Sequence, residues 1–225
     1  MDGLNYHYKY PHPSVTTDCV VFGYDGFRLN VLLVERGREP HKGKWAFPGG
    51  FLEIDEAAED GALRELYEET GLSSVDLRQF HSFTEPGRDP RERVISIAYY
   101  ALVSMRDVCG GDDAAAARWF ALDSVPPLAF DHDKMLATAV EALRKRALLE
   151  PTGSEVLQRE FGIDDLRQLY EAVLGMKVNA EKFESYVVGC GWIEPVGVYS
   201  SECLYRFCKN TSLGVLQLIR SEVTG

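Results

Sequence analysis

Apolar residues along the first part of the chain recur with two periods, one typical of strands and one typical of helices. Strand-like runs at Thr17–Phe22 and Asn30–Glu35 flank Gly23–Gly26, whose glycines and aspartate favour a hairpin turn. Val75–Phe83 and Val94–Val103 are also predicted strands, and the length of the second favours the centre of a sheet. The remaining predictions are a loop at Arg106–Ala117, a strand at Arg118–Leu122 and a helix at Asp131–Leu149.

A second unit is predicted beyond Leu149, because Glu150–Gly153 has the composition of a linker and the chain that follows is too long for a tail. Its predicted elements are a short helix at Ser154–Arg159, a helix at Asp164–Leu174, a helix that Asn179 caps and that ends at Val188, and strands at Trp192–Val196 and Leu204–Cys208. We therefore expect two domains, residues 1–150 and 151–225. The second has the element order of a winged helix, with Gly197–Cys203 as the wing.

The most informative stretch is Gly50–Leu72, which carries eight acidic residues. Positions three and four apart share one face of a helix, so the carboxylates of Glu65, Glu68 and Glu69 are predicted to project together. Clustered carboxylates repel, and simple folding does not require them. Oxygen ligands of this kind suit hard divalent cations. The opposite face is small or apolar and can pack: Ala58, Ala62, Leu63 and Leu66.

The ends of this helix are also predicted from the sequence. Asp55 is a plausible N-cap, and Gly71 stands where a left-handed residue commonly ends a helix. Gly49 and Gly50 precede the helix, and without side chains they allow a backbone carbonyl to approach a metal or a phosphate.

The same stretch resembles the Nudix box without a mismatch. The matching positions are Gly50, Glu56, Arg64, Glu65, Leu66, Glu68, Glu69, Gly71 and Leu72, at the spacing of that motif. The alternative is a solvated, charged amphipathic helix, but such a helix needs no glycines at set positions. Segments outside the box, such as Gly43–Phe51 and Pro86–Arg91, resemble the ADP-ribose pyrophosphatase branch and the Nudix half of NrtR-type transcription regulators. The C-terminal element order resembles the winged-helix domain of such regulators.

The resemblance implies a Nudix α/β/α sandwich with a mixed sheet, followed by a small winged-helix α+β domain. It also implies a cofactor, Mg²⁺ or Mn²⁺, held by Glu65, Glu68, Glu69 and a carbonyl at Gly49 or Gly50. Arg64 would hold the carboxylates in position, so the implied catalytic residues are Arg64, Glu65, Glu68 and Glu69. The general base stays open between Asp112, Asp113 and Glu85, and Glu53 and Glu56 are further candidates to assist.

Arginines in two loops are candidates for binding the substrate. Arg36 opens a basic loop ahead of the box, and Arg88 and Arg91 lie in the charged loop between two predicted strands. Guanidinium groups pair well with phosphates, so we predict these three as substrate-binding residues. The alternatives are a solvated loop for Arg36 and structural ion pairs for Arg88 and Arg91.

Charge argues against a default nucleic-acid binder. The formal net charge is -11, and residues 151–225 contain seven Lys and Arg against ten Asp and Glu. The second helix of the winged-helix unit carries Glu181 and Glu184 against Lys182, whereas helices that track phosphates are usually basic. DNA binding is therefore possible but disfavoured.

Two functions of different classes follow. The first is a Mg²⁺-dependent hydrolase that cleaves the diphosphate of ADP-ribose or a related nucleoside diphosphate derivative, and the complete acidic set places it ahead. The alternative is an NrtR-like regulator whose Nudix domain senses ADP-ribose or a sugar and whose winged helix binds DNA. Without a signal peptide or a long apolar run, we expect a cytoplasmic protein with no membrane partner. The resemblance also implies a homodimer.

Overall fold

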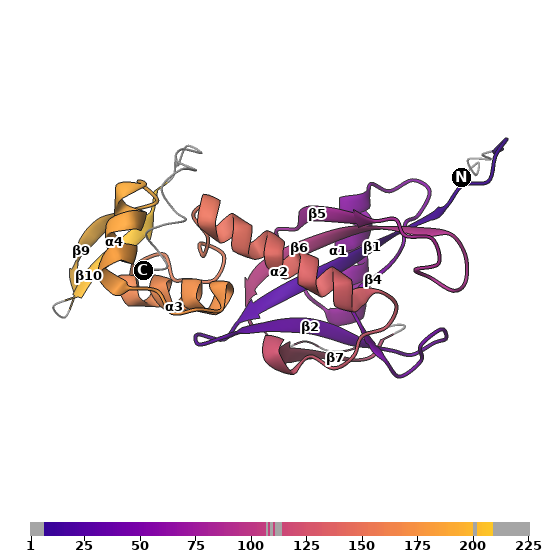
Figure 1. Ribbon diagram of the computed structural model, residues 1–225, viewed down its shortest axis with the longest axis horizontal. Helices are drawn as coiled ribbons and strands as arrows, with labels where there is room; N and C mark the ends of the chain where they lie inside the picture. The colour runs from indigo at the N-terminus through magenta and orange to yellow at the C-terminus, as the bar shows by residue number, and fades with distance from the viewer. Residues whose placement is uncertain (1–6, 107, 109, 111–113, 200–201, 209–225) are drawn as a thin grey trace.

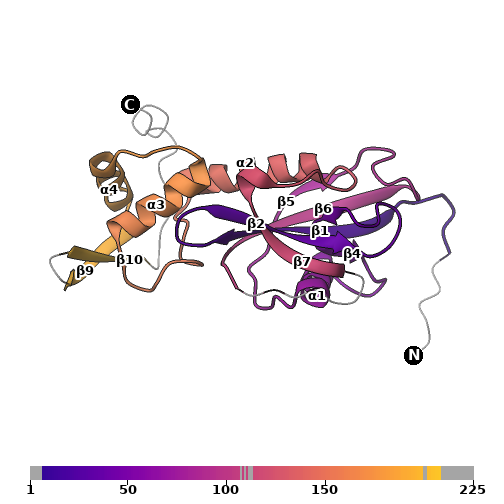
Figure 2. The ribbon, with the colours of Figure 1, turned by 90° about the horizontal axis from the view of Figure 1, so that it is seen from below.

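The computed structural model describes residues 7–106, 108, 110, 114–199 and 202–208. A larger body built on a sheet and a smaller C-terminal body lie end to end, and α2 (His132–Leu149) runs from the first toward the second (Figures 1 and 2). Asp112 and Asp113, two candidates for a general base, lie outside the described residues. Within the described part of the chain, no helix has the length and apolar character needed to cross a membrane.

The sheet of the larger body is mixed, because β1 pairs in parallel with β6 and antiparallel with β2 and β4. The main strand order is β3-β2-β1-β6-β5, while β4 pairs with β1 and β7 pairs with β2. The strands are β1 (Ser14–Tyr24), β2 (Leu29–Arg36), β3 (Trp45–Ala46), β4 (Gly49–Phe51), β5 (Arg78–Phe83), β6 (Val94–Ser104) and β7 (Ala114–Ala121).

Helices cover both faces of this sheet, with α1 (Ala58–Thr70) on one side and α2 on the other (Figure 2). Successive residues of a strand point to opposite faces. Val20 and Phe22 accordingly pack in the core on the α2 side, and Cys19 and Val21 pack in the core on the α1 side. Burial on both faces explains why the second half of β1, Cys19–Phe22, is apolar at consecutive positions rather than alternating.

The helix that carries the clustered carboxylates, α1, begins later than its sequence indicated. Its N-cap is Ala57, not Asp55, because the Glu56 carboxylate accepts hydrogen bonds from the Glu53 amide and from Arg64 and keeps this segment in a turn. The end is as predicted: Gly71 is left-handed, with φ of 74°. α2 begins at His132, directly after Asp131, as expected within one residue.

Three other expectations need correction. The predicted loop at Arg106–Ala117 contains the beginning of β7, so that strand is longer than Arg118–Leu122 and is followed by the short 3-10 helix Leu122–Ser124. β5 begins at Arg78 rather than Val75. Ser154–Arg159 is a turn rather than a helix, since the amides of Val156 and Leu157 both donate to the Gly153 carbonyl.

The C-terminal body is a small α+β unit with a three-stranded sheet in the order β8-β10-β9. Leu166, Leu169, Tyr170 and Val173 form the buried stripe of its first helix, as predicted. The Asn179 side chain caps the second helix by accepting from the Lys182 amide, also as predicted. The elements are β8 (Phe161–Gly162), α3 (Ile163–Leu174), α4 (Ala180–Gly189), β9 (Ile193–Tyr199) and β10 (Glu202–Phe207). The mixed sheet between helices and the small C-terminal domain are both confirmed.

The two bodies share one hydrophobic core. Leu143 and Ala147 of α2 belong to the same buried cluster as Leu166 and Leu169 of α3. A hydrogen bond also joins α2 to α3, because Arg144 donates from Nε to the Val173 carbonyl over 3.2 Å. α2 therefore connects the sheet of the larger body to the C-terminal body.

Candidate functional site

A cavity of about 880 Å³ opens between the acidic face of α1, the end of β2 and the beginning of α2. One wall carries the box carboxylates Glu65, Glu68 and Glu69, with Gly49 and Gly50 beside them. The facing walls come from segments distant in sequence, and their lining residues include Asp18, Arg36, Arg88, Asp89, Arg91, Phe130 and His132. The cavity therefore places acidic groups opposite guanidinium groups.

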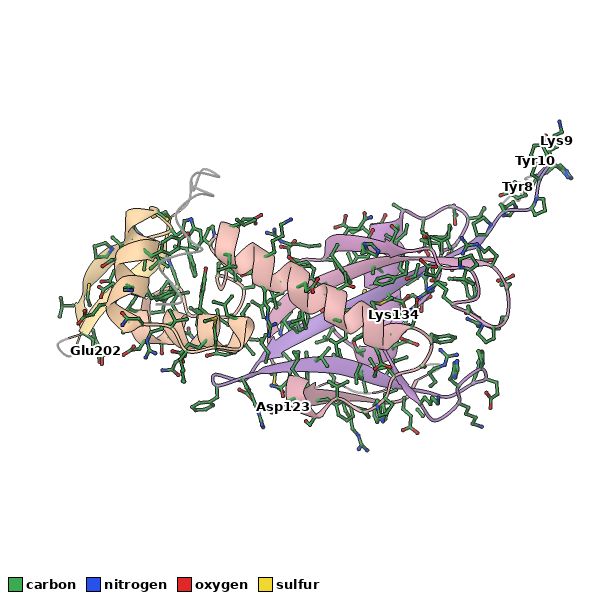
Figure 3. The ribbon with its side chains drawn as sticks, viewed as in Figure 1. Tyr8, Lys9, Tyr10, Asp123, Lys134 and Glu202 are labelled. Carbon is green, nitrogen blue, oxygen red and sulfur yellow. The ribbon has the colours of Figure 1, made fainter. Side chains whose placement is uncertain are left out.

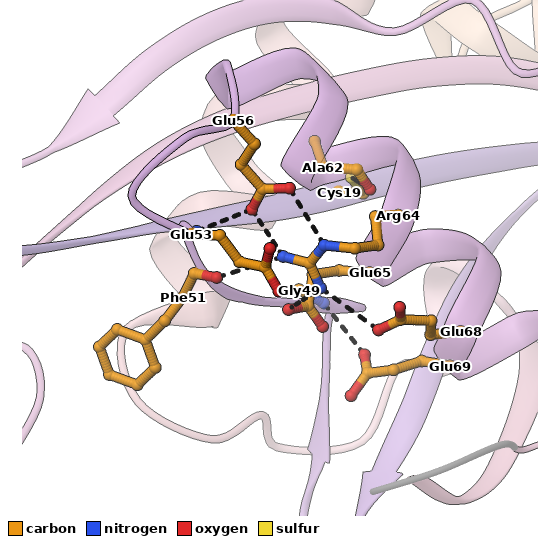
Figure 4. A network of polar contacts seen from close by, with 10 residues as sticks. All are labelled: Cys19, Gly49, Phe51, Glu53, Glu56, Ala62, Arg64, Glu65, Glu68 and Glu69. Atoms are coloured by element: carbon orange, nitrogen blue, oxygen red, sulfur yellow. Dashed lines mark hydrogen bonds and ion pairs between the residues drawn. The ribbon is translucent and has the colours of Figure 1, made fainter. Parts of the chain in front are cut away.

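Arg64 lies at the centre of the acidic wall (Figure 4). Its Nη2 donates to Glu56 over 2.7 Å, and its Nη1 donates to Glu65 over 2.8 Å and to Glu68 over 3.3 Å. Nη2 also donates to the Phe51 carbonyl over 3.4 Å, which connects α1 to β4. One guanidinium thus offsets the repulsion among three carboxylates.

Glu69 is the most deeply set of the box carboxylates. Its Oε2 accepts a hydrogen bond from the Gly49 amide over 3.0 Å. Burial raises the pKa of this carboxyl to about 7, and the nearby charges of Glu65 and Asp18 act in the same direction. Burial likewise raises the pKa of Glu65. Both groups would gain from a cation that compensates their charge.

Gly50 meets the acidic wall at close range. A Cβ at this position would lie 2.3 Å from Glu65 Oε1, so any side chain here would displace that carboxylate. The oxygens of Glu65, Glu68 and Glu69 are the right kind of ligand for Mg²⁺ or Mn²⁺. However, no group of three or more acidic, histidine or cysteine side chains is gathered closely enough to hold a metal within the described part of the chain. Arg64 already occupies Glu65 and Glu68, so metal binding would require that network to rearrange.

All three predicted substrate-binding arginines line the cavity, but they differ in what they contact. Arg88 is almost fully buried and forms a two-pronged ion pair with Asp131, at 2.7 and 3.1 Å. Arg91 is held in the same way by Asp89. Arg36 donates from Nε to the Pro40 carbonyl over 2.8 Å, and no ion pair joins it to a carboxylate of the described residues. Arg36 therefore has a guanidinium charge that remains available to an anionic ligand.

Two polar residues of the cavity were missed by the sequence reasoning. Asp18, on β1, accepts a hydrogen bond from Ser96 and lies 3.6 Å from Nε2 of His132. His132 Nδ1 accepts from the Phe47 amide over 3.0 Å, and burial lowers the pKa of this imidazole. The available signal for Asp18 was a charged residue directly before the apolar run Cys19–Phe22. Glu85, the remaining candidate for a general base, does not line this cavity.

Comparison with protein families gives a match to the NUDIX domain over residues 12–139. The chain belongs to the Nudix family. The match includes the box, the sheet and the beginning of α2, and it confirms the resemblance seen in the sequence.

Relatives of known function divide by how much of the chain they match. An ADPR-responsive transcriptional repressor from Acinetobacter baylyi is 30% identical over 190 residues, which is 82% of this chain and 76% of the repressor. An ADP-ribose pyrophosphatase from Methanocaldococcus jannaschii is 39% identical over 127 residues, which is 56% of this chain and 73% of that enzyme. The pyrophosphatase match thus covers much less of the chain than the repressor match.

Solved structures of one regulator match this chain both as a whole and in its Nudix part. Shewanella oneidensis NrtR superimposes with a TM-score of 0.75 at 29% identity, over 88% of this chain and 95% of that one. The same protein in complex with a 27mer DNA gives a TM-score of 0.73 at 28% identity, over 86% and 93% of the two chains. Its NUDIX domain in complex with ADP ribose gives 0.57 at 33% identity, over 62% of this chain and 94% of that one. The likeness therefore includes the small C-terminal domain.

Proposed function

We propose that this chain is a transcription regulator of the NrtR type, with a Nudix domain (residues 1–150) that binds ADP-ribose and a winged-helix domain (151–225) that binds DNA. One observation carries the proposal: the likeness to a repressor covers 82% of the chain, whereas the likeness to a pyrophosphatase covers 56%. The order of the two functions is therefore the reverse of the one that charge and the complete box favoured.

The cavity suits an anionic ligand with a diphosphate. Arg36 forms no ion pair with a carboxylate in the part of the chain that the structure describes, and guanidinium groups bind phosphate oxygens well. Arg88 is committed to Asp131, so its contribution is to hold the loop before β6 against the N-terminal end of α2. The other end of α2 packs against α3. A ligand that contacts the beginning of α2 could therefore change the position of α3 and, with it, the affinity for DNA.

The surplus of acidic over basic residues in the C-terminal domain overstates the negative charge on the exposed face of α4. Glu184 accepts a hydrogen bond from the Tyr205 hydroxyl and is only partly exposed. The exposed residues of α4 are Ala180, Glu181, Lys182, Ser185, Val188 and Gly189, which balance one acid against one base. A near-neutral helix of this kind can enter a groove of DNA without the repulsion that the sequence count implied.

Fluorescence anisotropy with a duplex from the region upstream of the chain's own gene tests the proposal. We expect binding that is specific over a scrambled duplex, and an affinity that ADP-ribose changes at least about fivefold, as coupling between two sites typically does. If no duplex binds above the non-specific level at physiological salt, the proposal is wrong.

Hydrolysis remains a second candidate, because every acidic position of the box is occupied. The residues that would hold Mg²⁺ are Glu65, Glu68 and Glu69, with the Gly50 carbonyl. A bound cation would offset charge on the phosphate oxygens and favour ionisation of water. Release of AMP from ADP-ribose, followed by chromatography with and without Mg²⁺, tests this role independently of DNA binding.

A further inference from the structure

One part of the cavity wall is aromatic rather than charged. The Phe51 ring, at the end of β4, is 38% exposed although it lines the cavity, and the Arg91 guanidinium lies 5.1 Å from its centre. The same guanidinium lies 6.0 Å from the centre of the Phe130 ring. The Arg91 guanidinium is therefore close to two aromatic rings of the cavity wall.

Arg91 is held in this place rather than free to follow an anion. Its backbone amide and its Nε both donate to Asp89 Oδ1, at 2.9 and 3.0 Å, and Nη2 donates to Oδ2 over 2.7 Å. Asp89 is itself buried, and its pKa is lowered by hydrogen bonds from Arg91, which outweigh the opposing effect of burial. The charge of Arg91 is thus largely compensated by Asp89, while its guanidinium remains part of the cavity lining.

Phe51 is held in a definite place relative to the carboxylates. Arg64 of α1 donates to its carbonyl, and β4 pairs with β1 so that Phe51 lies opposite Thr16. Figure 4 shows the Phe51 ring projecting away from Glu68 and Glu69. A ligand whose diphosphate lay at Arg36 could extend a second, planar part toward this ring, because Arg36 and Phe51 line the same cavity.

We propose that Phe51 and Arg91 form a stacking site for the nucleobase of the ligand. The inference rests on the proposed binding of a nucleoside diphosphate derivative, and it assigns Arg91 to the base instead of to the diphosphate. Bases stack favourably on aromatic rings and on guanidinium planes. Thr16 also lines the cavity, and it lies opposite Phe51 in the pairing of β1 with β4.

Phe130 has its ring close to two arginines of the cavity. It adopts a left-handed conformation, with φ of 53°, which is unusual for a bulky residue and is typically retained where function requires it. Its ring lies 4.7 Å from the Arg36 guanidinium as well as near Arg91. Phe130 therefore sets the spacing between the guanidinium assigned to the diphosphate and the one assigned to the base.

The test measures binding of ADP-ribose by calorimetry to the full chain and to three variants. Phe51→Leu removes the ring and keeps the apolar volume, so the dissociation constant should rise roughly 5- to 100-fold, in the range found when stacking is removed. Phe51→Trp keeps an aromatic ring at this position, so its dissociation constant should stay close to that of the wild-type chain. Phe27→Leu is the matched control, because Phe27 is 85% exposed on the β1–β2 hairpin and does not line this cavity.

A fluorescent ADP-ribose that carries ethenoadenine gives a readout of stacking itself. Its emission should be quenched on binding to the wild-type chain and less so on binding to Phe51→Leu at saturation. Equal affinity and equal quenching in wild type and Phe51→Leu would overturn the stacking site but leave the proposed function intact. Failure of the wild-type chain to bind ADP-ribose would overturn both.

Discussion

The two proposed activities depend on two amphipathic helices, α1 and α4. The sequence of α1 indicates its proposed role much more clearly than the sequence of α4 does. α1 buries Ala62 and Leu66 and turns toward the cavity a face of carboxylates that Arg64 holds together. α4 buries Phe183 and Val187, but its exposed face is short, mixed and nearly neutral. Chemistry on a phosphate needs particular groups at particular spacings, whereas contacts with the DNA backbone mainly position a helix and can come from many side chains.

The difference explains why charge and composition favoured the hydrolase, whereas the comparisons favour the regulator. The acidic face of α1 is visible at fixed spacing in the sequence, so it dominated the interpretation. The contribution of α4 depends on which of its side chains point outward, and Glu184 is directed to Tyr205 instead. Figure 3 shows Glu202 at the far end of the C-terminal body and Lys134 on α2 over the large sheet, so the two bodies present well-separated surfaces.

The largest expected effect concerns the α1 side of the comparison. If the chain hydrolyses ADP-ribose, Glu69→Gln should lower the Mg²⁺-dependent rate on the order of a hundredfold or more, because a buried carboxylate that faces the cation site is removed. Steady-state kinetics at saturating Mg²⁺ measure the change. Undiminished turnover would remove Glu69 from the metal site, and Phe27→Leu serves as a control with unchanged rate.

The next effect tests whether the two regions act as one structure. Leu169 is fully buried where α3 meets α2, so Leu169→Ala should lower the free energy of unfolding by about 2–5 kcal/mol. Urea denaturation, followed by tryptophan fluorescence and by circular dichroism, should give one shared transition. Two separated transitions in the wild-type chain would show that the regions unfold independently.

A pH effect on stability should arise from Glu69 on the α1 side. The folded pKa of Glu69 is raised from 4.5 to about 7, so the native state binds more protons than the unfolded state between these values. Stability contributed by protonated Glu69 is present below pH 4.5 and is lost as pH rises through 7. Without metal, wild type should lose about 1–3 kcal/mol relative to Glu69→Gln between pH 5 and pH 8. Parallel pH profiles of the two proteins would contradict this, and added Mg²⁺ should reduce the difference.

The smallest effect concerns α4. Lys182 is the one basic residue on its exposed face, so Lys182→Glu should weaken DNA binding roughly tenfold and lower its salt dependence. Lys134→Glu makes the same charge change on α2 and should leave DNA affinity nearly unchanged. If both variants lost affinity equally, total charge rather than the α4 surface would govern binding.

Much of this architecture was predictable from local pattern. The long strands β1, β2 and β6, the helix α2, the stripe of α3 and the cap at Asn179 follow from residue periodicity and capping chemistry, and the carboxylates of α1 follow from helical spacing. The partners across the cavity were not predictable in this way. Arg88 and Asp131 are 43 positions apart, and only the packing of α2 beside the loop before β6 brings them together.

The aromatic residues of the cavity were missed for the same reason. Phe51 and Phe130 look like ordinary apolar residues in sequence, and their role depends on the placement of Arg91 and Arg36 around them. Asp55 was assigned as a cap because the sequence could not show that Glu56 would instead be held by Arg64. The sequence thus revealed the chemistry of single elements, and the structure was needed for groups that meet between elements.

The most direct test of the account compares DNA binding by wild type and Arg36→Ala, each with and without saturating ADP-ribose. Anisotropy should show that both proteins bind the duplex equally without ligand, because Arg36 lies in the cavity of the larger body. ADP-ribose should then change the dissociation constant of wild type at least about fivefold and that of Arg36→Ala much less. An affinity for DNA that ADP-ribose leaves unchanged in wild type, while calorimetry shows the ligand bound, would contradict the account.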